Sequence, residues 1–138
     1  MTNTSAIGSD SPLKDEPFRV DITHPERVFE GAVWDIRRED FSYNGATIRR
    51  DYTDHTGAVA ILAVDEQDRV LLIQQYRHPI RSREWEIPAG LLDITGEDPL
   101  IGAKRELAEE ADLQAEHWSL LTDFATSPGG SDEYVRIY

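Results

Sequence analysis

Apolar residues in the first half of the chain occur in short runs, which is typical of β-strands. The region 18–52 has this pattern, and Asn44-Gly45 within it is a turn signal that predicts a hairpin. The run 57–64 (GAVAILAV) is dense and short, as expected of a buried strand, and 70–76 (VLLIQQY) predicts another. Because a proline disfavours helix at the residue before it, we expect 85–88 to be a short extended piece.

The pattern changes to that of a helix after a glycine-containing loop expected at 90–98. Asp98 is a suitable N-cap, and Pro99 follows at the first helical position, where proline is favoured. The apolar positions then repeat with helical spacing, so one face of this helix should pack on a core. These positions are Leu100, Ala103, Leu107 and Ala111.

Strand-like patterns return after the helix, at 118–124 and 134–138, with a glycine-rich turn at 127–131 between them. The sequence stops inside the last of these predicted strands, and no turn, cap or polar tail follows Tyr138. We therefore expect a truncated chain in which the C-terminal part of the fold is missing.

The length and composition predict three regions along the chain. Residues 1–17 are rich in Ser, Thr, Asp and Pro and predict a flexible leader. The strand-like region 18–54 comes next, and 55–138 should form the main domain. The longest apolar run, 58–64, is too short to span a bilayer, and the leader lacks the apolar core of a signal peptide, so we expect a cytoplasmic protein.

The net charge of −13, from 27 acidic and 14 basic residues, limits the partners of the protein. A strongly negative surface repels nucleic acid and anionic membranes, so we expect neither as a partner. A phosphate-containing small molecule is repelled too, unless a metal ion or a local group of arginines offsets the charge. There are no cysteines, which excludes disulfides and thiolate chemistry.

The predicted helix carries an acidic face, formed by Glu106, Glu109 and Glu110 at positions i, i+3 and i+4. Like charges at this spacing destabilise a helix by roughly 0.2–0.5 kcal/mol per pair. The helix dipole adds to the cost, because acidic groups near a C-terminus are unfavourable and Arg105 comes earlier. A solvated acidic surface is one interpretation. The other is a site for Mg²⁺ or Mn²⁺, which bind carboxylate oxygens.

The segment 85–113, WEIPAGLLDITGEDPLIGAKRELAEEADL, closely resembles the Nudix box, G-x5-E-x7-R-E-U-x-E-E-x-G-U, where U is aliphatic. Two positions depart from the pattern: six residues separate Gly90 from Glu97, and Asp112 replaces the last glycine. Asp is one of the few other residues that tolerates a left-handed helix end, and neither change removes a carboxylate. The matching positions are Gly90, Glu97, Arg105, Glu106, Leu107, Glu109, Glu110 and Leu113.

The resemblance implies an α/β fold, the Nudix α/β/α sandwich with a mixed sheet, over 55–138 and with the box at 90–113. It implies that Glu106 and Glu110 are the principal ligands of Mg²⁺ or Mn²⁺, helped by the carbonyl of Ala89. Glu109 would be a further ligand or a base that orients water. Arg105 and Glu97 would pair and brace the loop against the helix, which is also the ordinary structural interpretation of such a pair.

Beyond the box, the sequence is more similar to the ADP-ribose pyrophosphatase branch of the family than to its triphosphate-hydrolysing branch. In that branch, an N-terminal antiparallel strand region builds a homodimer, and the stretches that correspond to 74–77 and 85–90 bind substrate. Pro128 lies about where the branch has a marker proline. We expect Arg77 and Arg50 to contact phosphate and Glu86 to accept from a base or ribose, although each could instead form a surface ion pair.

These features predict metal-dependent hydrolysis of ADP-ribose to AMP and ribose 5-phosphate. Relatives in this branch continue past the strand that ends at Tyr138, into a loop whose glutamate can serve as the catalytic base. Three alternatives stay open: a Nudix hydrolase for another nucleotide, such as a nucleoside triphosphate or sugar nucleotide, a non-catalytic module that binds a nucleotide metabolite, and an inert fragment.

Overall fold

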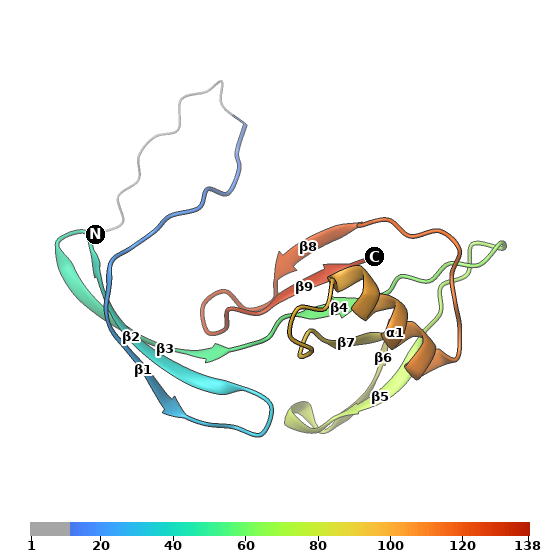
Figure 1. Ribbon diagram of the computed structural model, residues 1–138, viewed down its shortest axis with the longest axis horizontal. Coiled ribbons are helices and arrows are strands. Elements are labelled where there is room, and N and C mark those ends of the chain that lie inside the picture. Colours follow the sequence, from blue (N-terminus) through green and yellow to red (C-terminus); the bar gives the residue numbers. More distant parts are fainter. Residues whose placement is uncertain (1–11) are drawn as a thin grey trace.

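The computed structural model describes residues 12–138, in which a three-stranded sheet lies beside a body made of a mixed sheet, a hairpin and one α-helix (Figure 1). The three-stranded sheet contains β1 (Ile22–Phe29), β2 (Asp35–Tyr43) and β3 (Ala46–Asp54), and both of its pairings are antiparallel. The predicted leader lies mostly outside the described residues. Its described part, 12–17, is exposed and has no regular structure.

The strands β2 and β3 form the predicted hairpin. Asn44 and Gly45 connect them with positive φ angles of 51° and 76°, the backbone of a two-residue turn whose twist matches that of the flanking strands. Charged pairs then cross the hairpin: Arg38 makes a bidentate contact with Asp51 at 2.7 and 2.9 Å, and Asp40 accepts from Arg49 at 2.6 and 2.8 Å. No residue of β1, β2 or β3 is fully buried.

The sheet of the body has the order β7-β4-β9-β8. Its strands are β4 (Ala58–Ala60), β7 (Ala89–Leu91), β8 (Thr122–Ala125) and β9 (Tyr134–Ile137). The pairing of β4 with β9 is parallel and the other two pairings are antiparallel, so the sheet is mixed. The predicted α/β class, with a mixed sheet and a preceding antiparallel strand region, is confirmed. Within 12–138, one α-helix covers this sheet, and so one helical layer of the expected sandwich is seen.

The helix α1 (Pro99–Ala111) follows the predicted local signals. The Asp98 side chain accepts from the Leu100 N–H at 2.9 Å, and Asp112 ends the helix in the left-handed region with φ 54°. Ala103 and Leu107 of the predicted apolar face are buried, in a core with Val59 and Ile61. Within residues 12–138, no helix combines the length and the apolar character needed to cross a bilayer.

The remaining strands form a separate hairpin, β5 (Ile73–Arg77) and β6 (Ser82–Glu86), joined by the 3-10 turn His78–Ile80. Successive side chains of a strand point to opposite faces, so Gln75 and Arg77 of β5 lie on the same face of the hairpin as Ile73. Figure 1 shows this hairpin below the helix, next to β7.

Several predicted strand limits are wrong, because the backbone changes partners along the chain. The strand expected at 57–64 ends at Ala60: the next two N–H groups donate to Pro88 and then to Tyr138, and no single ladder continues. The strand expected at 70–76 begins only at Ile73. The strand expected at 118–124 begins only at Thr122, in β8. Of the extended piece expected at 85–88, only the first two residues are strand, because β6 begins earlier, at Ser82, and ends at Glu86. The loop expected at 90–98 begins as strand β7, which pairs with β4.

Candidate active site

The acidic face of α1 lies beside the strand β7, and its three glutamates have different surroundings. Glu106 is 12% exposed, whereas Glu109 is 59% exposed. Glu106 therefore faces the body of the protein and Glu109 faces solvent. Glu110 is half-buried between the helix and the strands β5 and β7.

Gly90 allows the carboxylate of Glu106 to lie directly on the backbone of β7. A Cβ atom at position 90 would stand only 1.9 Å from Glu106 Cδ and 2.2 Å from Glu106 Oε1. No side chain fits there unless the glutamate moves, so close approach explains why glycine is needed at this position. The first glycine of the box-like segment and its first helical glutamate thus form one structural unit.

Glu110 is held through both of its carboxylate oxygens. Gln75 Nε2 on β5 donates to Glu110 Oε1 at 2.6 Å, and the Ala89 N–H on β7 donates to Glu110 Oε2 at 3.0 Å. Gln75 was not predicted from the sequence as a site residue. The two-residue period of β5 could have indicated it, because this period places Gln75 on the same face as Arg77.

Arg105 connects the loop before α1 to the acidic face. Its guanidinium donates to both oxygens of Glu97 at 3.2 and 3.1 Å, so the predicted pairing of these residues is present. It also donates to Glu106 at 2.6 Å and to Glu109 at 3.2 Å. The hydrogen bonds to Glu97, and secondly to Glu106, raise the pKa of Arg105, which stays positively charged and offsets part of the carboxylate charge.

The predicted substrate residues Arg77 and Glu86 lie together on the β5–β6 hairpin. Arg77 Nε donates to the two Glu86 oxygens at 2.9 and 3.1 Å, and a second guanidinium nitrogen also contacts this carboxylate. The hydrogen bond raises the pKa of Arg77 and lowers that of Glu86, and the charge of Glu110 raises the pKa of Arg77 further. Gln75, two positions before Arg77 on the same strand, contacts Glu110, and this connects the hairpin to the acidic face.

The structure does not bring Arg50 into this group. Arg50 lies on β3, in the separate three-stranded sheet, and its guanidinium donates to the carbonyl of the neighbouring Arg49 at 2.9 Å. Among residues 12–138, no ion pair involves Arg50.

The acidic face suits a divalent ion such as Mg²⁺ that is coordinated partly by the protein and partly by a substrate. It does not suit an ion coordinated by protein side chains alone. Within 12–138, no three His, Cys, Asp or Glu side chains are grouped as a complete metal site, because Glu110 is turned toward Gln75 and Ala89, and Glu106 and Glu109 toward Arg105. Mg²⁺ usually takes only one or two carboxylates and completes its shell with water and phosphate. Glu106 and Glu110, both set against β7, provide this number of oxygen ligands.

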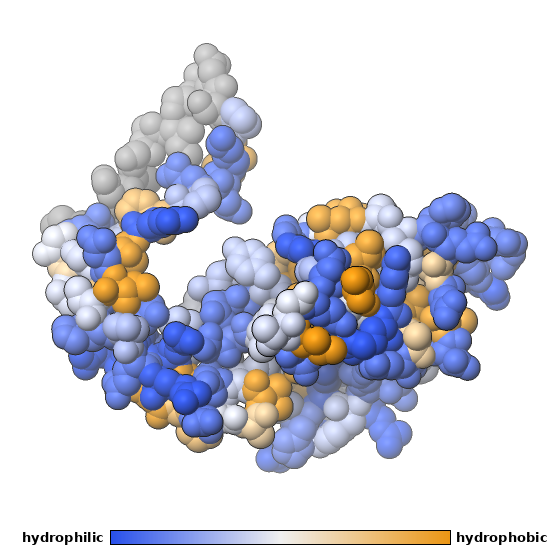
Figure 2. Space-filling model, in the orientation of Figure 1, coloured by the Kyte–Doolittle hydropathy of each residue, from blue (hydrophilic) through white to orange (hydrophobic). Residues whose placement is uncertain are grey.

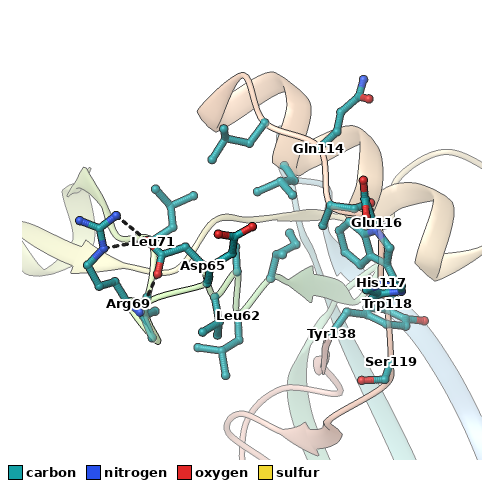
Figure 3. Close-up of a pocket in the computed structure, with 18 residues that line it drawn as sticks. Leu62, Asp65, Arg69, Leu71, Gln114, Glu116, His117, Trp118, Ser119 and Tyr138 are labelled. Atoms are coloured by element: carbon teal, nitrogen blue, oxygen red, sulfur yellow. Dashed lines mark hydrogen bonds and ion pairs between the residues drawn. The ribbon is translucent and has the colours of Figure 1, made fainter.

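A large hollow lies elsewhere in the body. A cavity of about 1000 Å³ lies between the segments 61–66 and 69–71 on one side and 113–119 on the other, with Tyr138 at its wall (Figure 3). Figure 3 shows Trp118 and Tyr138 side by side there, and their rings lie 6.5 Å apart. None of Glu106, Glu109 and Glu110 lines this cavity, so its size does not identify it as the reaction site.

Comparison with known proteins agrees with the resemblance that the box-like segment 85–113 shows. Residues 54–138 match the family model described as the NUDIX domain. An ADP-ribose pyrophosphatase of Mycobacterium tuberculosis is 46% identical over 82% of this chain. A methanol dehydrogenase activator of Bacillus methanolicus and an ADP-ribose pyrophosphatase of Bacillus subtilis are each 40% identical over the same share. The chain spans 55% of the first relative and 61% of the other two, somewhat over half their length.

A solved structure confirms the fold. The crystal structure of an ADP compounds hydrolase superposes with a TM-score of 0.70 at 24% identity, covering 90% of this chain and 68% of the other. At 24% identity, this similarity shows only that the strands and the helix are arranged in the same way.

Proposed function

The chain belongs to the Nudix family, and from this premise we propose that the protein hydrolyses the diphosphate bond of ADP-ribose, or of a similar nucleoside diphosphate compound. The products are AMP and ribose 5-phosphate. One observation carries the proposal: Glu106 and Glu110, one helical turn apart on α1, both lie against the backbone of β7 at residues 89 and 90. The names of two relatives, those of M. tuberculosis and B. subtilis, favour ADP-ribose as the substrate.

We propose Mg²⁺ or Mn²⁺ as the cofactor, held by Glu106 and Glu110 with the carbonyl of Ala89; Glu109 is either a further ligand or the base described below. When bound, such an ion neutralises phosphate oxygens and lowers the pKa of a coordinated water. It also answers the charge problem of a protein with a net charge of −13 that binds an anionic substrate.

The residues of the chain then have separate tasks in the reaction. Glu109, the most exposed of the three glutamates, accepts a proton from the attacking water, whose oxygen bonds to phosphorus as the bridging P–O bond breaks. Arg105, fixed by Glu97, keeps the loop and helix in register. Arg77 is half-exposed and exchanges Glu86 for a phosphate oxygen, since its guanidinium suits both partners. Glu86, once released, accepts from the ribose or base.

We also propose that the three-stranded sheet carries a homodimer contact. Apolar side chains on and beside it are exposed, including Phe29 at 61% and Val33 at 55%. Light scattering coupled to gel filtration tests this, and a monomer at micromolar concentration would contradict it. Arg50 is kept as a predicted phosphate contact, to be tested by Arg50→Ala in the assay below.

The assay for the main proposal is Mg²⁺-dependent release of AMP from ADP-ribose. Glu110→Gln should lower turnover by more than about a hundredfold, beyond the effect typical of outer-shell partners of a metal. Glu116→Gln, an exposed acidic position after the helix, is the matched control and should leave turnover unchanged. Cleavage of a nucleoside triphosphate or sugar nucleotide in place of ADP-ribose would refute the substrate. Binding of ADP-ribose without turnover would favour a non-catalytic binding module.

A further inference from the structure

We propose that Gln75 is a positioning residue that sets the orientation of Glu110 for metal binding. This inference rests on the proposed function, because it gives Gln75 a role only if Glu110 holds an ion. Gln75 comes from β5, 35 positions before Glu110, and its Nε2 lies 2.6 Å from Glu110 Oε1. It is half-buried, whereas its neighbour Gln74 is exposed.

The contact with Gln75 completes a two-point grip on the carboxylate. Glu110 Oε1 receives the Gln75 side chain and Oε2 receives the Ala89 N–H, so donors on two different strands define the rotation of the group. An ionised carboxylate has about four acceptor positions. One donor on each oxygen therefore leaves a free position on each oxygen for a cation. A ligand held in this way loses less conformational freedom when the ion binds.

The chemistry of an amide suits this position better than a charged side chain does. A lysine or arginine at position 75 would place a positive charge at the ligand and repel a divalent cation. A glutamate would repel Glu110 before the ion arrives. The amide N–H₂ supplies a hydrogen bond without adding a net charge.

The strand β5 also links metal binding to substrate binding. Gln75 and Arg77 share one face of the strand, and the charge of Glu110 acts on Arg77. A displacement of β5 would therefore alter both the metal ligand and the proposed phosphate contact. The antiparallel pairing of β5 with β6 keeps this strand in place.

The test is the affinity of the protein for Mn²⁺ in the absence of substrate, measured from the electron paramagnetic resonance signal of free Mn²⁺. Gln75→Met keeps the length of the side chain but removes the donor, and it should weaken binding by about 10–100-fold, as is typical for outer-shell partners of a metal. Gln74→Met makes the same change on the opposite, exposed face of β5 and should bind as the wild type does. In turnover, the loss should appear mainly as a higher Mn²⁺ requirement and only slightly in kcat at saturating metal.

The variant Glu110→Gln separates orientation from a general effect on folding. In that background, Gln75→Met should cause no further loss of Mn²⁺ affinity, because the two residues act as one unit. Unchanged Mn²⁺ affinity in Gln75→Met, or additive losses in the double variant, would overturn the role of Gln75 and leave the proposed function standing. If the wild type and Gln74→Met bind no Mn²⁺, either alone or with AMP present, the proposed function fails, and this inference fails with it. Melting curves within a few degrees of each other for the two methionine variants show that both are folded.

Discussion

The three-stranded sheet and the body of this protein are held together by different interactions. The body has an apolar core in which Val59, Ile61, Ala103 and Leu107 are at most 2% exposed. The sheet β1–β3 has no fully buried residue and is crossed by ion pairs such as Arg38–Asp51 and Arg49–Asp40. Figure 2 shows polar and apolar patches alternating on the surface of both regions. The buried core can therefore keep the residues of a site in fixed positions. The three-stranded sheet depends instead on exposed ion pairs, whose strength changes with pH and salt, and on any surface that covers it.

A short polar junction connects the two regions. The Thr53 N–H donates to the Gly130 carbonyl at 2.9 Å, and the Asp132 N–H donates back to Thr53 at 3.2 Å. The Asp132 carboxylate accepts from the His55 N–H at 2.8 Å. The end of β3 and the segment 130–132 are thus joined through the backbone, and within residues 12–138 the buried apolar cluster contains no residue of β1, β2 or β3.

The largest expected effect is on the body alone. Leu107→Ala should destabilise the protein by about 2–5 kcal/mol, because it leaves a cavity in a core that has few other members. Urea unfolding followed by circular dichroism measures the change. Ile101→Ala, on the exposed side of the same helix, is the control and should cost far less. Equal losses in the two variants would mean that the core does not dominate the stability of the body.

The proposed metal site should depend on the close approach of the Glu106 carboxylate to the backbone of β7 at Gly90. Gly90→Ala forces the Glu106 carboxylate off β7, so Mn²⁺ affinity and turnover should fall by at least about tenfold. Gly129→Ala adds the same atom where nothing lies within 4 Å, and it should have no effect on either quantity. A Gly90→Ala protein that binds Mn²⁺ normally would show that the position of Glu106 on β7 does not matter.

The junction offers a way to loosen the sheet from the body without unfolding either. Asp132→Ala removes the acceptor of the His55 N–H and should cost about 1 kcal/mol. Amide hydrogen exchange should rise in β2 and β3 and stay constant in α1. Asp93→Ala, at an exposed acidic position, serves as the control. If exchange in α1 rises as much as in β3, the two regions behave as one cooperative unit.

The smallest effect concerns acid and the sheet. Hydrogen bonds from Arg49 and Arg38 lower the pKa values of Asp40 and Asp51 below the ordinary value of 3.8. A lowered folded-state pKa contributes stability above the unfolded pKa, and this contribution is lost as the pH falls below 3.8 and through the folded-state values. Nuclear magnetic resonance peaks of β2 and β3 should therefore shift in this acid range, below pH 3.8. Asp51→Asn should reduce the shift, and peaks that stay in place through this range would show that these ion pairs do not stabilise the sheet.

Local features were predictable because they depend on neighbours within a few residues. The Asp98 cap, the left-handed end of α1 at Asp112 and the Asn44-Gly45 turn follow from short-range hydrogen bonds and backbone preferences. The same holds for the acidic face, whose members share one side of α1 through helical spacing alone. The sequence also predicted the Arg105–Glu97 pair, since both residues belong to one box-like motif.

What the sequence determined by itself was the helix, its caps, its acidic face and the resemblance to the Nudix box, because these depend on the order of neighbouring residues. The tertiary structure decided where β4 ends, that Gly90 makes room for Glu106, that Gln75 reaches Glu110, and that Arg50 lies on a different sheet. These features depend on strands distant in the chain meeting in three dimensions. Sequence spacing does not specify such contacts, because they arise only when the sheet and hairpin pack around α1.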